Sequence, residues 1–168
     1  MIASSLRTTK SYIIGIVIPD VSNSFFGRLV LSIEKILYQG NYRYILSNTD
    51  EEIKKEQEYM LTFMKYNTDE IITATSAVNG RQKVVRYYRD FLSQGKPVVF
   101  VDRVIEGLDA SYVIVDNAGV IIEQPVEEMG IIAATILMDL LNSSKRENRK
   151  VVLKARLIER GSVSCLKN

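Results

Sequence analysis

The chain has 168 residues, of which 46% are hydrophobic and 25% are charged, and its net charge is +2. This composition is that of a folded domain with its own core, so it excludes a wholly disordered chain, and the charge is too balanced to indicate nucleic-acid binding by itself. The lack of histidine excludes Ser-His-Asp and Cys-His nucleophiles and most zinc sites, and the single cysteine, Cys165, forms no internal disulfide.

The first part of the chain alternates strand-like and helical patterns. The run YIIGIVIP at 12–19 is apolar and β-branched and ends at proline, which is typical of a strand buried on both faces. Apolar residues then recur at helical spacing from Phe26 to Leu37, and Gly40 marks the end of that helix. A second strand is predicted at 42–47.

The next helix is predicted to begin at Asp50, a candidate N-cap, with Glu51 and Glu52 in the first turn, where the helix dipole favours acids. Four apolar residues would then share one face of this helix: Ile53, Met60, Leu61 and Met64.

The rest of the chain repeats the alternation. Further helices are predicted at 84–92, closed by Gly95, and at 126–141, where the amphipathic pattern is cleanest and Pro125 precedes the first turn. The remaining strands are predicted at 70–75, 97–101, 112–115 and 151–158.

This alternation predicts an α/β fold: a three-layer sandwich with a mostly parallel, doubly wound sheet. One antiparallel feature is also predicted, around the run Asp116-Asn117-Ala118-Gly119. Asp and Asn start turns, and glycine adopts positive φ at their end, so this run predicts a β-hairpin with Gly119 in the left-handed region. The competing interpretation is one continuous strand that runs into the helix.

Ligands of such sheets bind beyond the carboxyl ends of the strands, so the loops that follow the strands form the candidate site. The loop after the first strand, at 19–26, has no glycine and is therefore neither a dinucleotide fingerprint nor a P-loop. A phosphorylated receiver domain would need an aspartate after the third strand and a lysine after the fifth, and Thr75 and Asp116 stand there instead. With no general base, metal cluster or phosphate loop, we expect no enzymatic activity, no cofactor and no metal.

What remains at this edge is a set of amide, aromatic, carboxylate and guanidinium groups, which suits a neutral polyhydroxylated ligand. The residues concerned are Asn23, Phe25, Phe26, Asp50, Asp102 and Arg103.

Each of these residues also has a purely structural interpretation. Phe26 begins the apolar stripe of the first helix and fits the core, whereas Phe25 fits a ligand contact equally well. Asn23 could be the N-cap of that helix, and Asp102 and Arg103 could form a surface ion pair.

Several motifs resemble the effector-binding domain of LacI/GalR-type bacterial transcriptional regulators. They are IGIVIPDVSNSFF at 14–26, NTD at 48–50 with Glu56, GKPVVFVDR at 95–103, VDN at 115–117, and QPVEEMG at 124–130 followed by 152–160. The resemblance covers nearly the whole chain and implies a flavodoxin-like lobe of a periplasmic-binding-protein-like fold. It also implies a sugar or related metabolite as ligand, with Asn23, Phe25, Phe26, Asp102 and Arg103 lining the cleft.

The sequence departs from this family at Ser24, where proline is frequent, and at Glu70, where glycine is common. Residues 1–10 resemble the remnant of a hinge, and 11–168 would form a single effector-binding lobe. The helix-turn-helix and most of the second lobe have no counterpart, so we expect no specific DNA binding by this chain. The alternative is an excised or engineered stand-alone flavodoxin-like lobe without ligand-binding activity.

Partners and location follow from the same observations. The one cysteine, the lack of an apparent leader and the lack of a membrane-spanning apolar run lead us to expect a cytoplasmic protein without membrane contact. A lobe standing alone exposes surface that is covered in the two-lobed family, so we also expect a homodimer through the first helix and the neighbouring strand edge.

Overall fold

The computed structural model describes residues 10–77, 82–116, 124–143 and 146–155, and these build one six-stranded sheet in the order β2-β1-β3-β4-β5-β6. Every pairing in it is parallel. The strands are β1 (Ile13–Ile18), β2 (Arg43–Asn48), β3 (Glu70–Thr73), β4 (Val98–Val101), β5 (Ser111–Asp116) and β6 (Lys150–Lys154). The predicted α/β class and parallel sheet are confirmed.

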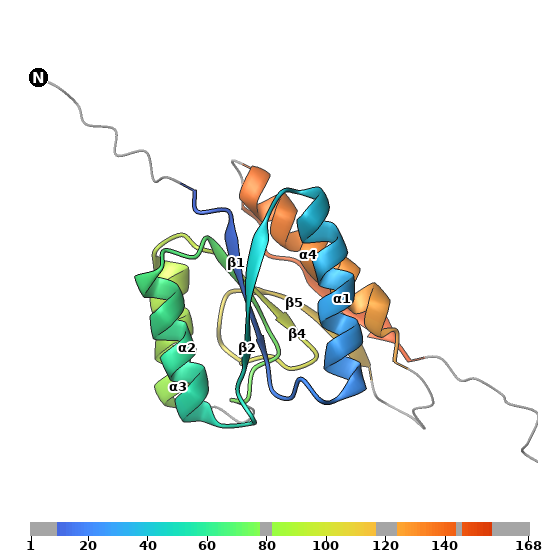
Figure 1. Cartoon of the computed structure of the whole chain (residues 1–168), viewed down its shortest axis with the longest axis horizontal. Helices are drawn as coiled ribbons and strands as arrows, with labels where there is room; N and C mark the ends of the chain where they lie inside the picture. Colours follow the sequence, from blue (N-terminus) through green and yellow to red (C-terminus); the bar gives the residue numbers. More distant parts are fainter. Residues whose placement is uncertain (1–9, 78–81, 117–123, 144–145, 156–168) are drawn as a thin grey trace, which may run out of the picture.

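Four helices among the described residues cover the two faces of the sheet (Figure 1). They are α1 (Ser24–Gln39), α2 (Ile53–Lys65), α3 (Gln82–Ser93) and α4 (Val126–Asn142). Helices α1 and α4 pack against each other on one face, and α2 and α3 on the other. Alternate residues of the central strands point to opposite faces, so the side chains of the sheet enter two separate apolar clusters, one under each helix pair.

Some boundaries differ from the sequence-based prediction. The third strand ends at Thr73 rather than at 75, because Thr75 leaves the sheet and its hydroxyl bonds to the carboxylate of Glu56. Strand β5 is bordered by parallel β4 and β6. The return stretch of the predicted hairpin, 117–123, lies outside the described residues.

The prediction for the start of α2 was wrong. Glu52, not Asp50, occupies the N-cap position, and it makes no side-chain capping bond. Asp50 has a φ of 52°, and its carboxylate accepts from the amide of Asn48 and from Lys55, which competes with capping. Leu61, predicted on the apolar face, is 49% exposed, whereas Phe63 is fully buried.

Helices α1 and α4 lie very close together at Gly130. A Cβ atom added there would lie 2.0 Å from the hydroxyl oxygen of Ser32 and 2.8 Å from the carbonyl oxygen of Leu29. Both distances are shorter than real contacts, and the second involves backbone, so only glycine permits this packing.

Gly130→Ala is therefore expected to lower the free energy of unfolding by roughly 1–3 kcal/mol, because the two helices must separate. Gly27→Ala is the matched control, since Gly27 is also helical but has no atom within 4 Å of its Cβ position. That variant is expected to raise the free energy of unfolding by up to about 1 kcal/mol, from helix propensity. Urea denaturation measures the free energy of unfolding of both variants. Equal changes in Gly130→Ala and Gly27→Ala would contradict the close approach of the two helices.

Candidate functional site

The loops after β1, β2, β3 and β4 meet at the carboxyl edge of the parallel sheet, which is the lower end of the sheet in Figure 1. In sheets of this kind the carboxyl edge is where ligands bind. The polar side chains there form two groups, one centred on Arg103 and the other on the start of α1.

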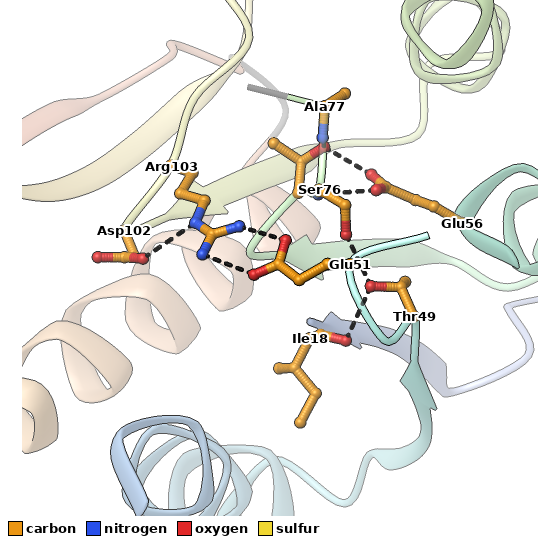
Figure 2. Close-up of polar contacts among 9 residues, drawn as sticks. Ile18, Thr49, Glu51, Glu56, Ser76, Ala77, Asp102 and Arg103 are labelled. Atoms are coloured by element: carbon orange, nitrogen blue, oxygen red, sulfur yellow. Dashed lines mark hydrogen bonds and ion pairs between the residues drawn. The ribbon is translucent and has the colours of Figure 1, made fainter. Parts of the chain in front are cut away.

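Arg103 lies directly after β4, and its guanidinium makes a two-pronged ion pair with Glu51 (Figure 2). Nη1 donates to Oε2 of Glu51 at 2.7 Å and Nη2 donates to Oε1 at 2.9 Å, while Nε lies 3.6 Å from Oδ2 of Asp102. The fork of Arg103 thus already binds a pair of carboxylate oxygens, which is the geometry with which arginine binds oxygen-rich ligands.

The electrostatics of this group follow from its partial burial. The hydrogen bonds that Arg103 donates to the carboxylate of Glu51 raise the pKa of Arg103, so its guanidinium stays charged. Burial raises the pKa of Asp102, and the nearby Arg103 opposes that effect. The side chains of Arg103 and Asp102 are 28% and 21% exposed. A ligand reaching them would meet charges that are only partly screened by water.

Strained backbone accompanies the charged group. Asp50, Glu51 and Asp102 have φ angles of 52°, 58° and 63°, in the left-handed region that residues with a Cβ rarely adopt. The amide N–H of Asp102 donates to Val113 at 3.0 Å, which helps to hold the strained turn. Such conformations cost about 1–3 kcal/mol each, and the described residues Tyr12, Asn41 and Asn67 at the opposite edge of the sheet adopt them too, so the strain alone does not mark this edge as the site.

A buried carboxylate holds the neighbouring loop after β3. Glu56 of α2 is fully buried, and its Oε1 accepts from the hydroxyls of Thr75, at 2.6 Å, and Tyr88, at 2.5 Å. Its Oε2 accepts from the amide of Ser76 at 2.8 Å, and the hydroxyl of Ser76 lies 2.7 Å from that of Thr49 (Figure 2). The loops after β2 and β3 are therefore fixed to α2 beside Arg103.

The other three predicted site residues form a separate group at the start of α1. Asn23 is the N-cap of this helix, and its Oδ1 accepts from the amide of Phe25 at 2.9 Å. Phe26 is only 4% exposed and belongs to the core, and Phe25 is partly buried with its ring edge-to-face against Phe26 at 4.9 Å. Among the described residues, no hydrogen bond or ion pair joins this group to Arg103.

Sequence reasoning missed the partners of the predicted residues. It treated Glu51 only as a first-turn acid, and nothing local reveals that this residue meets Arg103, 52 positions away. The burial of Glu56 could have been predicted from the sequence, because Glu56 lies on the same buried face of α2 as Met60 and Phe63. An acid within an apolar stripe indicates a buried hydrogen-bonded carboxylate.

In a parallel α/β lobe, a polar cluster at the carboxyl edge lies where small ligands usually bind. The chain belongs to the family described as periplasmic binding proteins and the sugar binding domain of the LacI family, whose model matches residues 11–129. It is an effector-binding domain of the LacI type, as the motifs predicted.

Individual relatives agree with this assignment. The ribose operon repressor of Bacillus subtilis is 38% identical over 106 residues, which is 63% of this chain and 30% of the repressor. The ribose operon repressor of Lactococcus lactis is 30% identical over 150 residues, 88% of this chain and 42% of that protein. The chain thus spans less than half the length of these two repressors.

Among solved structures, a LacI family transcriptional regulator from Enterococcus faecium, crystallised with bound ribose, superposes with a TM-score of 0.73 at 18% identity. The superposition covers 92% of this chain and all of that one, and it confirms the fold. In the part of the chain that the structure describes, no helix is long and apolar enough to cross a membrane.

Proposed function

We propose that this domain binds a sugar, with a pentose such as ribose as the first candidate, at the carboxyl edge of its sheet, as the effector-sensing part of a cytoplasmic transcriptional regulator. The observation that carries the proposal is the Arg103–Asp102–Glu51 cluster, a partly buried oxygen-binding group at the strand ends. The names of the relatives, which are ribose operon repressors, supply the ligand class and assign no catalysis.

Each predicted residue has a distinct proposed contact. The guanidinium of Arg103 donates to two sugar oxygens, and the carboxylate of Asp102 accepts from neighbouring hydroxyls. The ring of Phe25 covers an apolar face of the sugar, and Asn23 uses its amide NH₂, since its Oδ1 is engaged as the helix cap. Phe26 supports Phe25 from the core through their edge-to-face contact.

The affinity of this lobe for a sugar is expected to be millimolar. Arg103 is already bonded to Glu51, so a sugar has to share or displace that carboxylate. Each hydrogen bond then contributes about 0.5–1.5 kcal/mol, against several kcal/mol of lost translational and rotational freedom. A lobe that covers one side of the ligand leaves the other side in water.

Calorimetric titration with D-ribose, D-glucose and sucrose tests this proposal. We expect weak saturable binding of D-ribose that is lost in Arg103→Ala and in Asp102→Ala but kept in Arg86→Ala, an exposed arginine on α3. Micromolar affinity would contradict the one-sided site. Binding that persists in both site variants would place the site elsewhere, and no binding at all would favour a lobe without ligand.

We also propose a homodimer through α1 and the edge strand β2. Leu31 and Tyr38 are 64% and 67% exposed and lie seven residues apart on one face of α1. Tyr44 and Leu46 of β2 are 36% and 38% exposed and point to the α1 side like Tyr42, and Tyr44 lines one pocket together with Tyr38. An unpaired sheet edge beside an apolar helix face is a surface that a second copy covers symmetrically.

Tyr38→Glu is therefore expected to shift the protein to a monomer in sedimentation equilibrium, because a charge would be buried in the interface. Tyr66→Glu is the control, since Tyr66 is 62% exposed but follows α2 on the other face of the sheet. A wild-type monomer at high concentration would contradict the dimer.

We predict that the described lobe does not bind DNA specifically. Specific DNA binding would need a helix-turn-helix segment of the kind that LacI-type regulators carry.

A further inference from the structure

The amino-terminal edge of the sheet, opposite the sugar site, carries two adjoining cavities of about 500 and 370 Å³. They share Gly95, Lys96 and Arg146. These residues lie in the loops that precede β4 and β6, so the cavities lie at the upper end of the sheet in Figure 1. Volumes of about 300–1,000 Å³ are usual for small-molecule sites.

Glu70 is a buried acid in the lining of the smaller cavity. It is the first residue of β3, its side chain is fully buried, and it lines the cavity. Within the described residues neither of its carboxyl oxygens has a hydrogen-bond partner. Burial raises the pKa of Glu70 to about 9, so at pH 7 the group is neutral and has a hydroxyl to donate. Buried polar groups are almost always bonded, so an acid without a partner among the described residues fits a ligand acceptor in this cavity.

Three cations line the same cavity: Lys10, Lys96 and Arg146. Each donates to a neutral oxygen, Lys10 to the carbonyl of Leu141, Lys96 to the side chain of Asn67, and Arg146 to the carbonyl of Gly95. None of the three is within ion-pair distance of a carboxylate in the described part of the chain. They keep positive charge and free donors in the cavity.

Asp69, the other acid in the described lining of this cavity, does not neutralise those cations by direct contact. The carboxylate of Asp69 accepts from the backbone amides of Ser11, at 2.9 Å, and Tyr12, at 2.8 Å, so both of its oxygens are engaged. With Glu70 neutral, the cavity carries a net positive charge and an excess of hydrogen-bond donors, which is the chemistry of an oxyanion site.

The larger cavity adds an apolar surface to this cationic end. Its lining includes Leu92, Pro97, Leu108 and Leu140, which come from α3, α4 and the loops before β4 and β5. A ligand whose charged head lay among the cations could therefore extend its organic part along these side chains, where apolar surface is removed from water.

We propose that the amino-terminal edge is a second ligand site, which binds a small organic anion with a phosphate or carboxylate head. Arg146, Lys96 and Lys10 hold the oxygens of the head, and the hydroxyl of Glu70 donates to one of them. The organic part lies against Leu92 and Leu108. The site is independent of the sugar site, since it lies at the opposite ends of the strands.

Amide chemical-shift titrations of nitrogen-15-labelled protein at pH 7 and constant ionic strength test the site, with inorganic phosphate, phenyl phosphate and benzoate as probes. We expect saturable shifts at the amides of Gly95 and Lys96 and none at Arg103. Phenyl phosphate should bind about tenfold more tightly than inorganic phosphate, because burying the ring adds apolar contact. Tighter binding of phenyl phosphate than of benzoate assigns a phosphate head, and the reverse order assigns a carboxylate head.

Variants separate this site from non-specific attraction to basic surface. Arg146 is exposed, so Arg146→Ala should leave the fold intact while weakening phenyl phosphate or benzoate about tenfold. Arg86→Ala, also on the surface but outside both cavities, should leave the affinity unchanged. Shifts that rise linearly without saturating, or that are the same in Arg146→Ala as in the wild type, would overturn the proposal.

Discussion

Glu70→Gln is expected to raise the free energy of unfolding at pH 7 by up to about 3 kcal/mol. In the folded protein burial raises the pKa of Glu70 to about 9, from the ordinary value of 4.5 that applies to the unfolded chain. Between these two values the unfolded chain releases the proton and the folded protein keeps it, so unfolding is favoured by about 1.4 kcal/mol for each pH unit above 4.5. Glutamine is neutral in both states and removes that penalty.

The sign of this effect distinguishes it from ordinary acid denaturation. The stability of the wild type should fall relative to Glu70→Gln as the pH rises from 4.5 to 9, and the two proteins should converge near pH 4.5. Urea denaturation at several pH values measures the difference, with Glu58→Gln on the exposed face of α2 as a control for loss of a surface charge. A variant less stable than the wild type at pH 8 would show that Glu70 is ionised and paired in the folded protein.

Glu56→Ala is expected to have the opposite effect and to lower the free energy of unfolding by about 3–5 kcal/mol. Removing the carboxylate leaves the hydroxyls of Thr75 and Tyr88 and the amide of Ser76 without the acceptor that they share. Both hydroxyls belong to fully buried residues, so water does not readily replace the carboxylate. The loop after β3 should loosen as well.

Glu58→Ala provides a matched control on the same helix, since its side chain is exposed, and should change stability by less than about 0.5 kcal/mol. Glu56→Gln should fall between the two, because an amide keeps one acceptor oxygen but turns its NH₂ group toward a donor. Equal stability of Glu56→Ala and the wild type in urea denaturation would contradict the assigned hydrogen bonds.

The fold could be predicted from the sequence because its strands are nearly continuous apolar runs and its helices are amphipathic. Such patterns are set by local spacing and depend little on distant contacts. Predictions that depend on the hydrogen bonds of a single side chain, such as a helix N-cap, are less reliable. Asp50 has the chemistry of an N-cap, yet Asn48 and Lys55 bind its carboxylate instead.

The site was predictable only in part, for a similar reason. Asp102 and Arg103 could be identified because they follow a buried strand directly, and the carboxyl edge is defined by topology. Their link to Glu51 depends on how α2 is placed against β4, which no local pattern contains. Glu70 appeared in the sequence only as a departure from the related family, and its meaning depends on the cavity around it.

An amide chemical-shift map of the protein with D-ribose tests most directly whether the sugar site lies at the carboxyl edge. We expect saturable shifts with millimolar affinity at Phe25, Asp102 and Arg103, their loss in Arg103→Ala, and no shift at Gly95 or Lys96. An absence of shifts at about 100 mM D-ribose, or shifts confined to the amino-terminal edge, would contradict the proposed site.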